Sequence, residues 1–230
     1  MRLDTPESAS KPGVISRILL LGGVVMVVDF RGPATFVRLH YSSSDELQRK
    51  VELMSTIAHS PQPSVWPEIP PPADIAMRAV DWRVVGGLME DAQRDLGELA
   101  VEIGVSRRSV ERRLEAMSNA RAIYLVGQPD VAAVAGVVCD LILSYSSVAE
   151  KERGDRWLVS EIPRVAYLNS ELERRTIVTF LRENLAEAER VLQNVRAGVE
   201  AESVGMESIR QLTVSTRWQA ERVRTLGRPA

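Results

Sequence analysis

Prolines are concentrated in one stretch of the chain, residues 60–72, which contains six of them. Proline fixes the backbone φ angle and lacks an N–H donor, so this stretch cannot form a helix. We interpret residues 60–73 as a semi-rigid linker, with Val65-Trp66 as a short docked strand within it. The chain is therefore expected to have one structured part before this linker and at least one after it.

The part before the linker has the pattern of a small half-domain. Residues 1–13 are small, polar and proline-containing, and we expect them to be disordered. Strands are predicted over Ile15–Asp29 and Thr35–Tyr41, with a Gly-Pro turn between them. A helix is predicted from Ser44 onward, because apolar residues then recur at helical spacing. Residues 14–59 are therefore predicted to form a β–β–α half-domain.

The apolar run Ile18–Val28, eleven residues long, raises the question of a membrane or export segment. It is too short for a membrane span, which needs about 20 residues. A signal peptide is the alternative, but Asp29 and Arg31 follow where a small-residue cleavage site belongs. We interpret the run as a buried strand or strand pair broken at Gly22-Gly23, and we expect a cytoplasmic protein with no membrane partner.

The charges of the chain are almost balanced, with 29 Lys and Arg against 31 Asp and Glu. This balance excludes a polycationic nucleic-acid coat, so any DNA binding must come from a local basic surface. The single cysteine, Cys139, cannot form an intrachain disulfide, which is typical of a reducing compartment. Because Cys139 lies in an apolar stretch, we interpret it as a core residue and not as a nucleophile.

Residues 74–130 carry the strongest functional pattern, that of a winged helix-turn-helix. A first helix is predicted over Asp81–Asp91. Asp95 can cap a second helix, and Gly104 follows its last apolar residue, where a tight turn needs a left-handed backbone. Ser106 can then cap the third helix.

The third helix would present a basic face to solvent. In a helix-turn-helix, the N-terminal half of the recognition helix enters the major groove, where arginine can bind guanine or phosphate. A strand over Ala122–Val126 and a return strand over Ala132–Ala135 would form the wing. The predicted DNA-contacting residues are Ser106, Arg107, Arg108, Ser109, Arg112, Arg113 and Arg121.

Residues 131–218 have the order β–α–β–β–α–β, which is the ferredoxin-like order. The polar tail, residues 219–230, is expected to be loose. The predicted fold class is therefore α+β: a winged helix-turn-helix plus a ferredoxin-like domain, preceded by the β–β–α segment. The strands are predicted over Val134–Tyr145, Arg164–Ser170, Arg175–Arg182 and Ser208–Ser215, and the helices over Ser147–Glu161 and Asn184–Ala201.

With these residues in place, residues 81–215 resemble the leucine-responsive regulator (Lrp/AsnC) family, in which a helix-turn-helix precedes a ferredoxin-like effector domain. The resemblance rests on Gly104-Val105-Ser106 in the turn and on Ser109-Val110 and Arg113-Leu114 in the recognition helix. It implies a transcription regulator that binds double-stranded DNA as a homodimer or higher homo-oligomer. It also implies a C-terminal domain that joins subunits and can bind a small-molecule effector.

Two features depart from the family. Its Gly-x-x-Asp turn, which helps to bind amino-acid effectors, is replaced by Asn169–Arg175, which contains no glycine. The effector-binding residues are therefore left unassigned. The family also has no segment like residues 15–58, which look like half of another effector domain and indicate a tandem arrangement.

The sequence favours no enzyme. It has no phosphate-binding or dinucleotide-binding glycine loop, and its two histidines, His40 and His59, are too few for a His-rich metal site. We expect no catalytic residues, no cofactor and no metal. The main alternative is a ligand-sensing or scaffold protein whose helix-turn-helix contacts proteins without binding DNA. Glu111 and Glu115 favour this alternative, since they repel phosphate.

Two sequence features need a structural explanation. Gly86-Gly87 lies inside a predicted helix, where each glycine costs about 1 kcal/mol relative to alanine. We expect close packing of another segment there. Asp140 lies in an apolar strand, where a carboxylate is costly unless it is paired. We expect it on the solvent face, or facing an arginine or a ligand.

Overall fold

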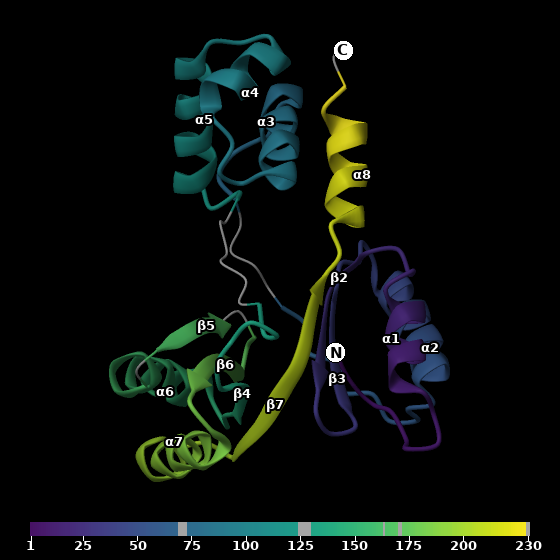
Figure 1. The fold of residues 1–230 in the computed structure, drawn as a ribbon, viewed down its shortest axis with the longest axis vertical. Coiled ribbons are helices and arrows are strands. Elements are labelled where there is room, and N and C mark those ends of the chain that lie inside the picture. Colours follow the sequence, from purple (N-terminus) through teal and green to yellow (C-terminus); the bar gives the residue numbers. More distant parts are fainter. Residues whose placement is uncertain (69–72, 124–129, 163, 170–171, 229–230) are drawn as a thin grey trace. The chain divides into compact units, whose positions relative to one another are not determined.

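The computed structural model describes residues 1–68, 73–123, 130–162, 164–169 and 172–228. The chain divides into two compact units, each built from segments that are separate in the sequence (Figure 1). The helix-turn-helix segment is inserted between two parts of the first unit, and the C-terminal end of the chain belongs to the second. Unit 1 comprises Met1–Pro70 and Gln128–Val214, and unit 2 comprises Pro71–Gly127 and Ser215–Ala230.

Unit 1 is built on one antiparallel sheet with the strand order β1-β3-β2-β7-β4-β6-β5. The long strand β7 joins its two halves, because residues 203–208 pair with β4 and residues 209–214 pair with β2. We call the halves the N-terminal module (residues 1–68) and the C-terminal module (residues 137–214). The strands are β1 (Arg2–Asp4), β2 (Val24–Phe30), β3 (Ala34–Leu39), β4 (Val137–Ser144), β5 (Val165–Asn169), β6 (Arg175–Arg182) and β7 (Ser203–Val214).

The C-terminal module confirms the ferredoxin-like prediction. Its elements follow the order β4-α6-β5-β6-α7-β7, and its strands lie in the order β7-β4-β6-β5. Ser147 caps α6 (Val148–Glu161) and Asn184 caps α7 (Leu185–Gly198). Both helices pack on one face of the sheet through a core of buried apolar side chains that includes Cys139, Leu141, Leu143, Leu158, Phe180 and Val195 (Figure 1).

The N-terminal module differs from the predicted half-domain. Residues 1–13 are ordered, because Leu3 is fully buried in β1. The predicted strand over residues 15–29 is wrong in its first part, where α1 (Lys11–Ile18) forms. Proline fits the first turn of a helix, and the buried residues Val14 and Ile18 lie one turn apart. After β2 and β3, α2 (Ser44–Ala58) is capped by Ser43.

Residues 60–68 are docked on unit 1 and do not act as a spacer. The backbone of Ser64 exchanges two hydrogen bonds with Arg2, at 2.7 and 3.1 Å. The ring of Trp66 lies edge-on to Phe36, with 5.1 Å between ring centroids. Glu68 pairs with Arg38 at 2.6 Å. The predicted linker therefore begins after these contacts.

The N-terminal module is itself ferredoxin-like, but its elements follow a circularly permuted order. In the C-terminal module, the fourth, first, third and second strands lie side by side (β7-β4-β6-β5). In the N-terminal module, β2, β3, β1 and the bridged residue Ser64 lie side by side in that order. They take the places of the fourth, first, third and second strands, so β1 counts as the third strand. Then β1, α1 and β2 correspond to β6, α7 and β7, while β3 and α2 correspond to β4 and α6. Every neighbouring pair is antiparallel in both modules.

A repeated sequence motif supports this correspondence. Tyr41-Ser42-Ser43 precedes α2 and Tyr145-Ser146-Ser147 precedes α6, each followed three residues later by a glutamate, Glu46 or Glu150. In both copies, the second serine accepts a hydrogen bond from the glutamate amide at 3.2 Å. In both copies, the first serine hydroxyl donates to the glutamate carboxylate at 2.5 Å. The same capping arrangement therefore follows β3 and β4.

The two modules also pack face to face. Phe30 and Phe36 of the N-terminal module lie in one apolar cluster with Val138, Ile142 and Leu181 of the C-terminal module. Burial of such side chains is the main favourable contribution to packing between sheets. The sheet face that α6 and α7 leave open is therefore covered by the N-terminal module of the same chain.

Unit 2 contains the three predicted helices and a fourth from the C-terminal end. The prediction of a loose tail is wrong, because α8 forms there and packs on α3 (Figure 1). A Cβ atom on Gly86 of α3 would lie 2.7 Å from Val223 of α8, and one on Gly87 would overlap Leu99 of α4. The two glycines thus allow α3 to be approached closely from two sides. The helices are α3 (Ala79–Glu90), α4 (Leu96–Ile103), α5 (Arg107–Asn119) and α8 (Arg217–Leu226).

Candidate nucleic-acid interface

The segment from the start of α4 to the start of α5 is fixed by three local features that the sequence predicts. The Asp95 carboxylate accepts hydrogen bonds from the amides of Gly97 and Glu98, at 2.8 and 3.0 Å. These bonds, led by the one from Glu98, lower the pKa of Asp95 and keep it ionised. Gly104 has a φ of 73°, in the left-handed region. The Ser106 hydroxyl accepts from the Ser109 amide at 3.2 Å and so caps α5.

The inner face of α5 is anchored in a small core. Ala100 is almost completely buried where α4 meets its neighbours, and its short side chain allows close approach of the helices. Helix α5 has a fixed orientation in unit 2 because its apolar stripe is buried. The buried residues of this core are Val84, Leu99, Ala100, Ile103, Val110 and Met117.

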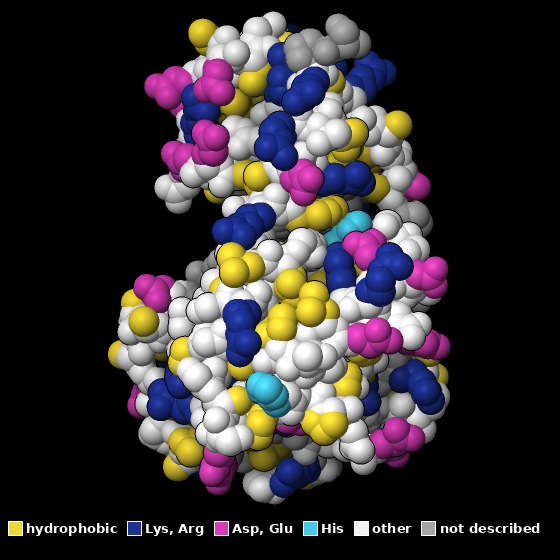
Figure 2. All heavy atoms as spheres, turned by 90° about the vertical axis from the view of Figure 1, so that its right-hand side faces the viewer, with side chains coloured by type: hydrophobic (Ala, Val, Ile, Leu, Met, Phe, Trp, Pro, Cys, Tyr) yellow, Lys and Arg dark blue, Asp and Glu magenta, His cyan; other side chains and the backbone are white. Residues whose placement is uncertain are grey.

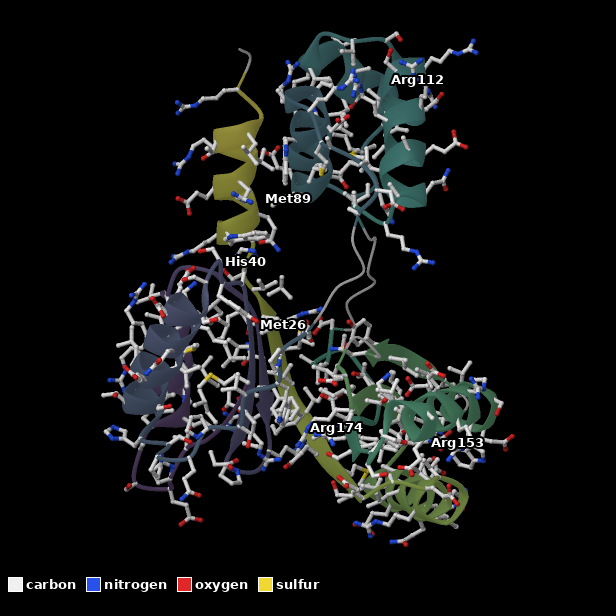
Figure 3. The ribbon with its side chains drawn as sticks, turned by 180° about the vertical axis from the view of Figure 1, so that it is seen from behind. Met26, His40, Met89, Arg112, Arg153 and Arg174 are labelled. Carbon is white, nitrogen blue, oxygen red and sulfur yellow. The ribbon has the colours of Figure 1, made fainter. Side chains whose placement is uncertain are left out.

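Arg108 and Arg112 form the free basic pair of the interface. They lie one helical turn apart on α5, and both are exposed. Among the described residues, neither takes part in an ion pair or a side-chain hydrogen bond with another residue. Figure 3 shows Arg112 on the outer side of α5. Two guanidinium groups are therefore available on this face to an incoming anion or base edge.

Arg107 is exposed but engaged. Its Nε atom lies 2.9 Å from Oε1 of Glu111, and its Nη1 atom lies 3.6 Å from Oδ2 of Asp95. The hydrogen bond with Glu111 is the largest cause of a raised Arg107 pKa, followed by the charge of Asp95. Arg107 thus connects the first turn of α5 to the first turn of α4, and it also offsets the charge of Glu111.

Arg113 does not belong to the exposed face. Its Nη1 atom lies 2.6 Å from Oδ1 of Asp81, a carboxylate that is almost fully buried in α3. The spacing of α5 contains a signal for this position, because Arg113 follows the buried Val110 by three residues and precedes the buried Met117 by four. We therefore remove Arg113 from the predicted DNA contacts and assign it to the packing of α3 against α5.

The predicted wing falls only partly within the described residues. Arg121 is exposed and has a φ of 54°, so the chain turns sharply just after α5. Residues 124–126 of the predicted wing strand lie outside the described residues. The predicted return strand over residues 132–135 is wrong, because residues 131–133 form a turn, where Ala132 donates to the Asp130 carboxylate.

The described part of the chain offers neither a metal-binding cluster nor a membrane-spanning helix. No three or more His, Cys, Asp or Glu residues come together there as a metal-binding group. No helix in the described ranges is long and apolar enough to span a membrane.

No protein-family model matches the chain, and no curated protein is similar to it in sequence. Solved structures are similar to it in fold. PH0061 matches with a TM-score of 0.50 and 18% sequence identity, over 60% of this chain and 95% of that one. An AsnC family transcriptional regulator from Agrobacterium tumefaciens matches with a TM-score of 0.44 and 20% identity, over 59% of this chain and 91% of that one. AsnC from E. coli matches with a TM-score of 0.45 and 18% identity, over 60% of this chain and 94% of that one.

The likeness to PH0061 defines the class of fold. The chain combines a helix-turn-helix unit with a ferredoxin-like module, and the predicted α+β fold class is confirmed. A large part of this chain lies outside the match, which fits the presence of a second, permuted module in unit 1.

Proposed function

We propose that the protein is a sequence-specific, DNA-binding transcription regulator of the Lrp/AsnC type, with α5 as its recognition helix. The observation that carries this proposal is the exposed pair Arg108 and Arg112 on a helix whose opposite side is buried. Four residues of helix separate them by about 6 Å, which suits contacts to successive base pairs or phosphates. A bidentate arginine–guanine contact discriminates against a wrong base by about 1–3 kcal/mol.

The acidic residues of α5 weigh against DNA binding less than the sequence suggests. Glu111 is paired with Arg107, so its repulsion of phosphate is reduced. Glu115 has no ion-pair partner among the described residues. Glu115 keeps the alternative open, namely a ligand-sensing or scaffold protein whose helix-turn-helix contacts proteins.

The proposed homodimer or higher homo-oligomer needs a surface that the chain does not already use. The open face of the C-terminal module is covered by the N-terminal module, so it is not available to a second copy. Strand β5 lies at the end of the sheet, and among the described residues its outer side pairs with no other strand. Edge strands are a common route to pairing between chains, so we place the subunit contact there. Light scattering over a concentration series, with Leu168→Pro as the variant, tests this placement.

The C-terminal module is also proposed to bind a small-molecule effector. A hollow of about 240 Å³ lies beside the turn that precedes β6. Its lining includes Arg174 and Arg175, and the Arg175 guanidinium lies 4.6 Å from the centre of the Trp66 ring. Its lining also includes Glu173 and Glu202, so the hollow offers groups of both charges to a zwitterionic amino acid, beside an aromatic wall. Titration calorimetry with single amino acids, repeated with Arg174→Ala, tests it.

The test of the main proposal is fluorescence anisotropy with a duplex from the protein's own upstream DNA and a scrambled duplex of equal composition. The wild type is compared with R108A/R112A. A matched control, R49A/R190A, removes two exposed arginines of unit 1. We expect preference for the upstream duplex, abolished in R108A/R112A and kept in the control. Equal, salt-insensitive signals for both duplexes would reject DNA recognition and favour the protein-contact alternative.

A further inference from the structure

Helix α8 has the highest ratio of basic to acidic residues among the helices of unit 2. Its ten residues include Arg217, Arg222 and Arg224 against a single acid, Glu221, and Arg228 follows just after it. All four arginines are exposed. Figure 2 views the molecule from the side on which α8 lies in Figure 1, and arginine side chains follow this helix.

The arginines of α8 are not used to hold the fold together. Among the described residues, none of the four takes part in an ion pair, and only Arg222 has an aromatic contact, 5.8 Å from the centre of the Trp218 ring. By contrast, most arginines of α3 and α5 are engaged, and so is Arg94 between α3 and α4. Arg83 donates to the Ile103 carbonyl, Arg94 pairs with Glu102, and Arg107 and Arg113 pair as described above.

The helix that carries these charges is held in place on α3. Val223 sits against Gly86, where any larger residue would push it away, and Gly227 lies close to the aliphatic part of Arg83. Residues 217, 224 and 228 recur at intervals of seven and four, so they lie on one face of the helix or its continuation. Over seven residues a helix rises about 10 Å, which is the span of a few phosphates along one DNA strand.

We propose that α8 is a second DNA-binding element, which binds the phosphate backbone of the duplex whose bases α5 reads. The inference rests on the proposed function, because it takes duplex DNA as the ligand. Helix α5 leaves only Arg108 and Arg112 free, which is a small cationic surface for a polyanion. Helix α8 supplies the missing positive charge within the same unit. Phosphate contacts position a protein on DNA and add affinity without reading sequence.

The experiment uses the full chain, the upstream and scrambled duplexes, and a KCl series from about 50 to 300 mM, chosen because phosphate contacts are salt-dependent. The variant is R217Q/R224Q/R228Q, which removes the three arginines of the proposed face. The control is R49Q/R156Q/R190Q, which makes the same charge change on exposed positions of unit 1. Circular dichroism checks that both variants keep the helix content of the wild type.

We expect the slope of log affinity against log salt to fall by about 2 to 3 in the α8 variant, close to 0.9 for each phosphate that is no longer neutralised. Affinity for both duplexes should fall by a similar factor, so the preference for the upstream duplex is kept. An α8 variant that binds like the control, with an unchanged slope, would overturn the role of α8 and leave that of α5 intact. A wild type that binds neither duplex would overturn the proposed function together with this inference.

Discussion

Arg113 of α5 forms an ion pair with Asp81 of α3, with 2.6 Å between Nη1 and Oδ1. Asp81 also accepts a hydrogen bond from the amide of Arg78 at 2.7 Å, so one carboxylate closes the first turn of α3 and holds α5. The arginine is mostly buried and the aspartate almost completely so. Its neighbour in sequence, Arg112, points to solvent, and the two arginines therefore have different tasks.

Replacing Arg113 with alanine should destabilise unit 2 by about 3 kcal/mol, because it leaves the buried Asp81 carboxylate without its cation. Arg112→Ala should change stability by less than about 0.5 kcal/mol. Hydrogen exchange of the α3 and α5 amides measures both effects locally. Equal protection in the two variants would contradict the assignment of Arg113 to the fold.

Gly86→Ala should destabilise the contact between α3 and α8 by about 1–2 kcal/mol, although alanine is the better helix former. The added methyl group would meet Val223. Val223→Ala makes room for it, so a double-mutant cycle should give a positive coupling between the two positions. A Gly86→Ala protein that is more stable than the wild type would show that α8 does not rest on this site.

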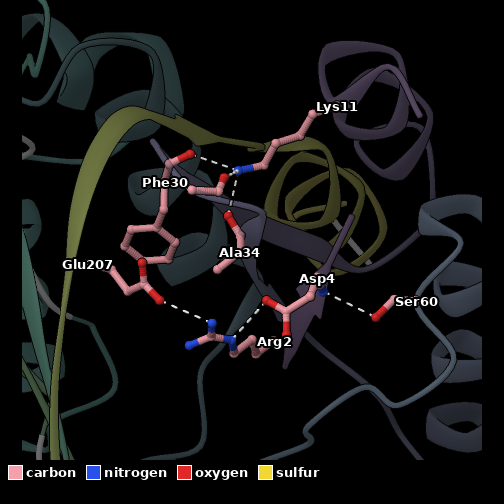
Figure 4. Close-up of polar contacts among 8 residues, drawn as sticks. Arg2, Asp4, Lys11, Phe30, Ala34, Ser60 and Glu207 are labelled. Atoms are coloured by element: carbon pink, nitrogen blue, oxygen red, sulfur yellow. Dashed lines mark hydrogen bonds and ion pairs between the residues drawn. The ribbon is translucent and has the colours of Figure 1, made fainter. Parts of the chain in front are cut away.

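Lys11→Met should destabilise unit 1 by about 2 kcal/mol, because three carbonyls lose their donor and the buried Asp29 carboxylate keeps only one of its two cations, Arg210. The Lys11 ammonium donates to the carbonyls of Phe30 and Ala34, at 2.7 and 2.6 Å (Figure 4). It also donates to the Gly32 carbonyl at 2.7 Å and lies 2.8 Å from the Asp29 carboxylate. Urea unfolding followed by circular dichroism measures the decrease in stability. Arg17→Ala, on the exposed side of the same helix, is the control and should change little.

Asp140 should make stability fall as pH rises through neutrality. It is buried and accepts a hydrogen bond from Thr179 at 2.6 Å; burial, assisted by the charge of Glu207, raises its pKa to about 7. An unfolded aspartate titrates near pH 4, so between about pH 4 and 7 the folded state holds a proton that the unfolded state has released. The folded state is therefore favoured at low pH, and this contribution disappears above pH 7.

The Asp140→Asn variant removes this titration. Between pH 5 and 8 the wild type should lose about 2–3 kcal/mol of unfolding free energy more than the variant does. Urea unfolding at four pH values measures the difference. Parallel curves for the two proteins would mean that Asp140 is already ionised in the fold. The structure also corrects the expected environment of Asp140, which faces Thr179 and neither solvent nor an arginine.

The features that the sequence predicts well depend on residues close together in the chain. Asp95, Gly104, Ser106 and Asn184 each act on the next few backbone groups, so their types and positions suffice. The ferredoxin-like order of the C-terminal module is readable for the same reason, since each strand and helix shows its own periodicity. The basic residues of α5 are also correctly placed on that helix, and only Arg113 faces inward.

The features that the sequence misses depend on distant partners. The position of the Lys11 side chain depends on carbonyl groups about twenty residues later in the chain, and β1 is ordered by its pairing with β3 and Ser64. None of the residues of helix α8 is fully buried, and its packing depends on Gly86, more than a hundred residues earlier. The Gly86-Gly87 pair in α3 is the sequence signal for this packing. Two glycines inside a helix are destabilising unless another segment packs closely against them. The ferredoxin-like order of the N-terminal module is not recognisable in the sequence, because its first strand along the chain takes the place of the third strand in the ferredoxin-like sheet.

Strand β7 has a consequence for the order in which the chain can fold during synthesis. It leaves the ribosome after every other strand of the sheet, yet it completes both modules, pairing with β4 and with β2. Until it emerges, β2 and β4 each present an unpaired edge, and such edges invite association with other chains. The β2 edge therefore stays unpaired while the whole helix-turn-helix segment is made, the β4 edge joins it afterwards, and one late strand closes both.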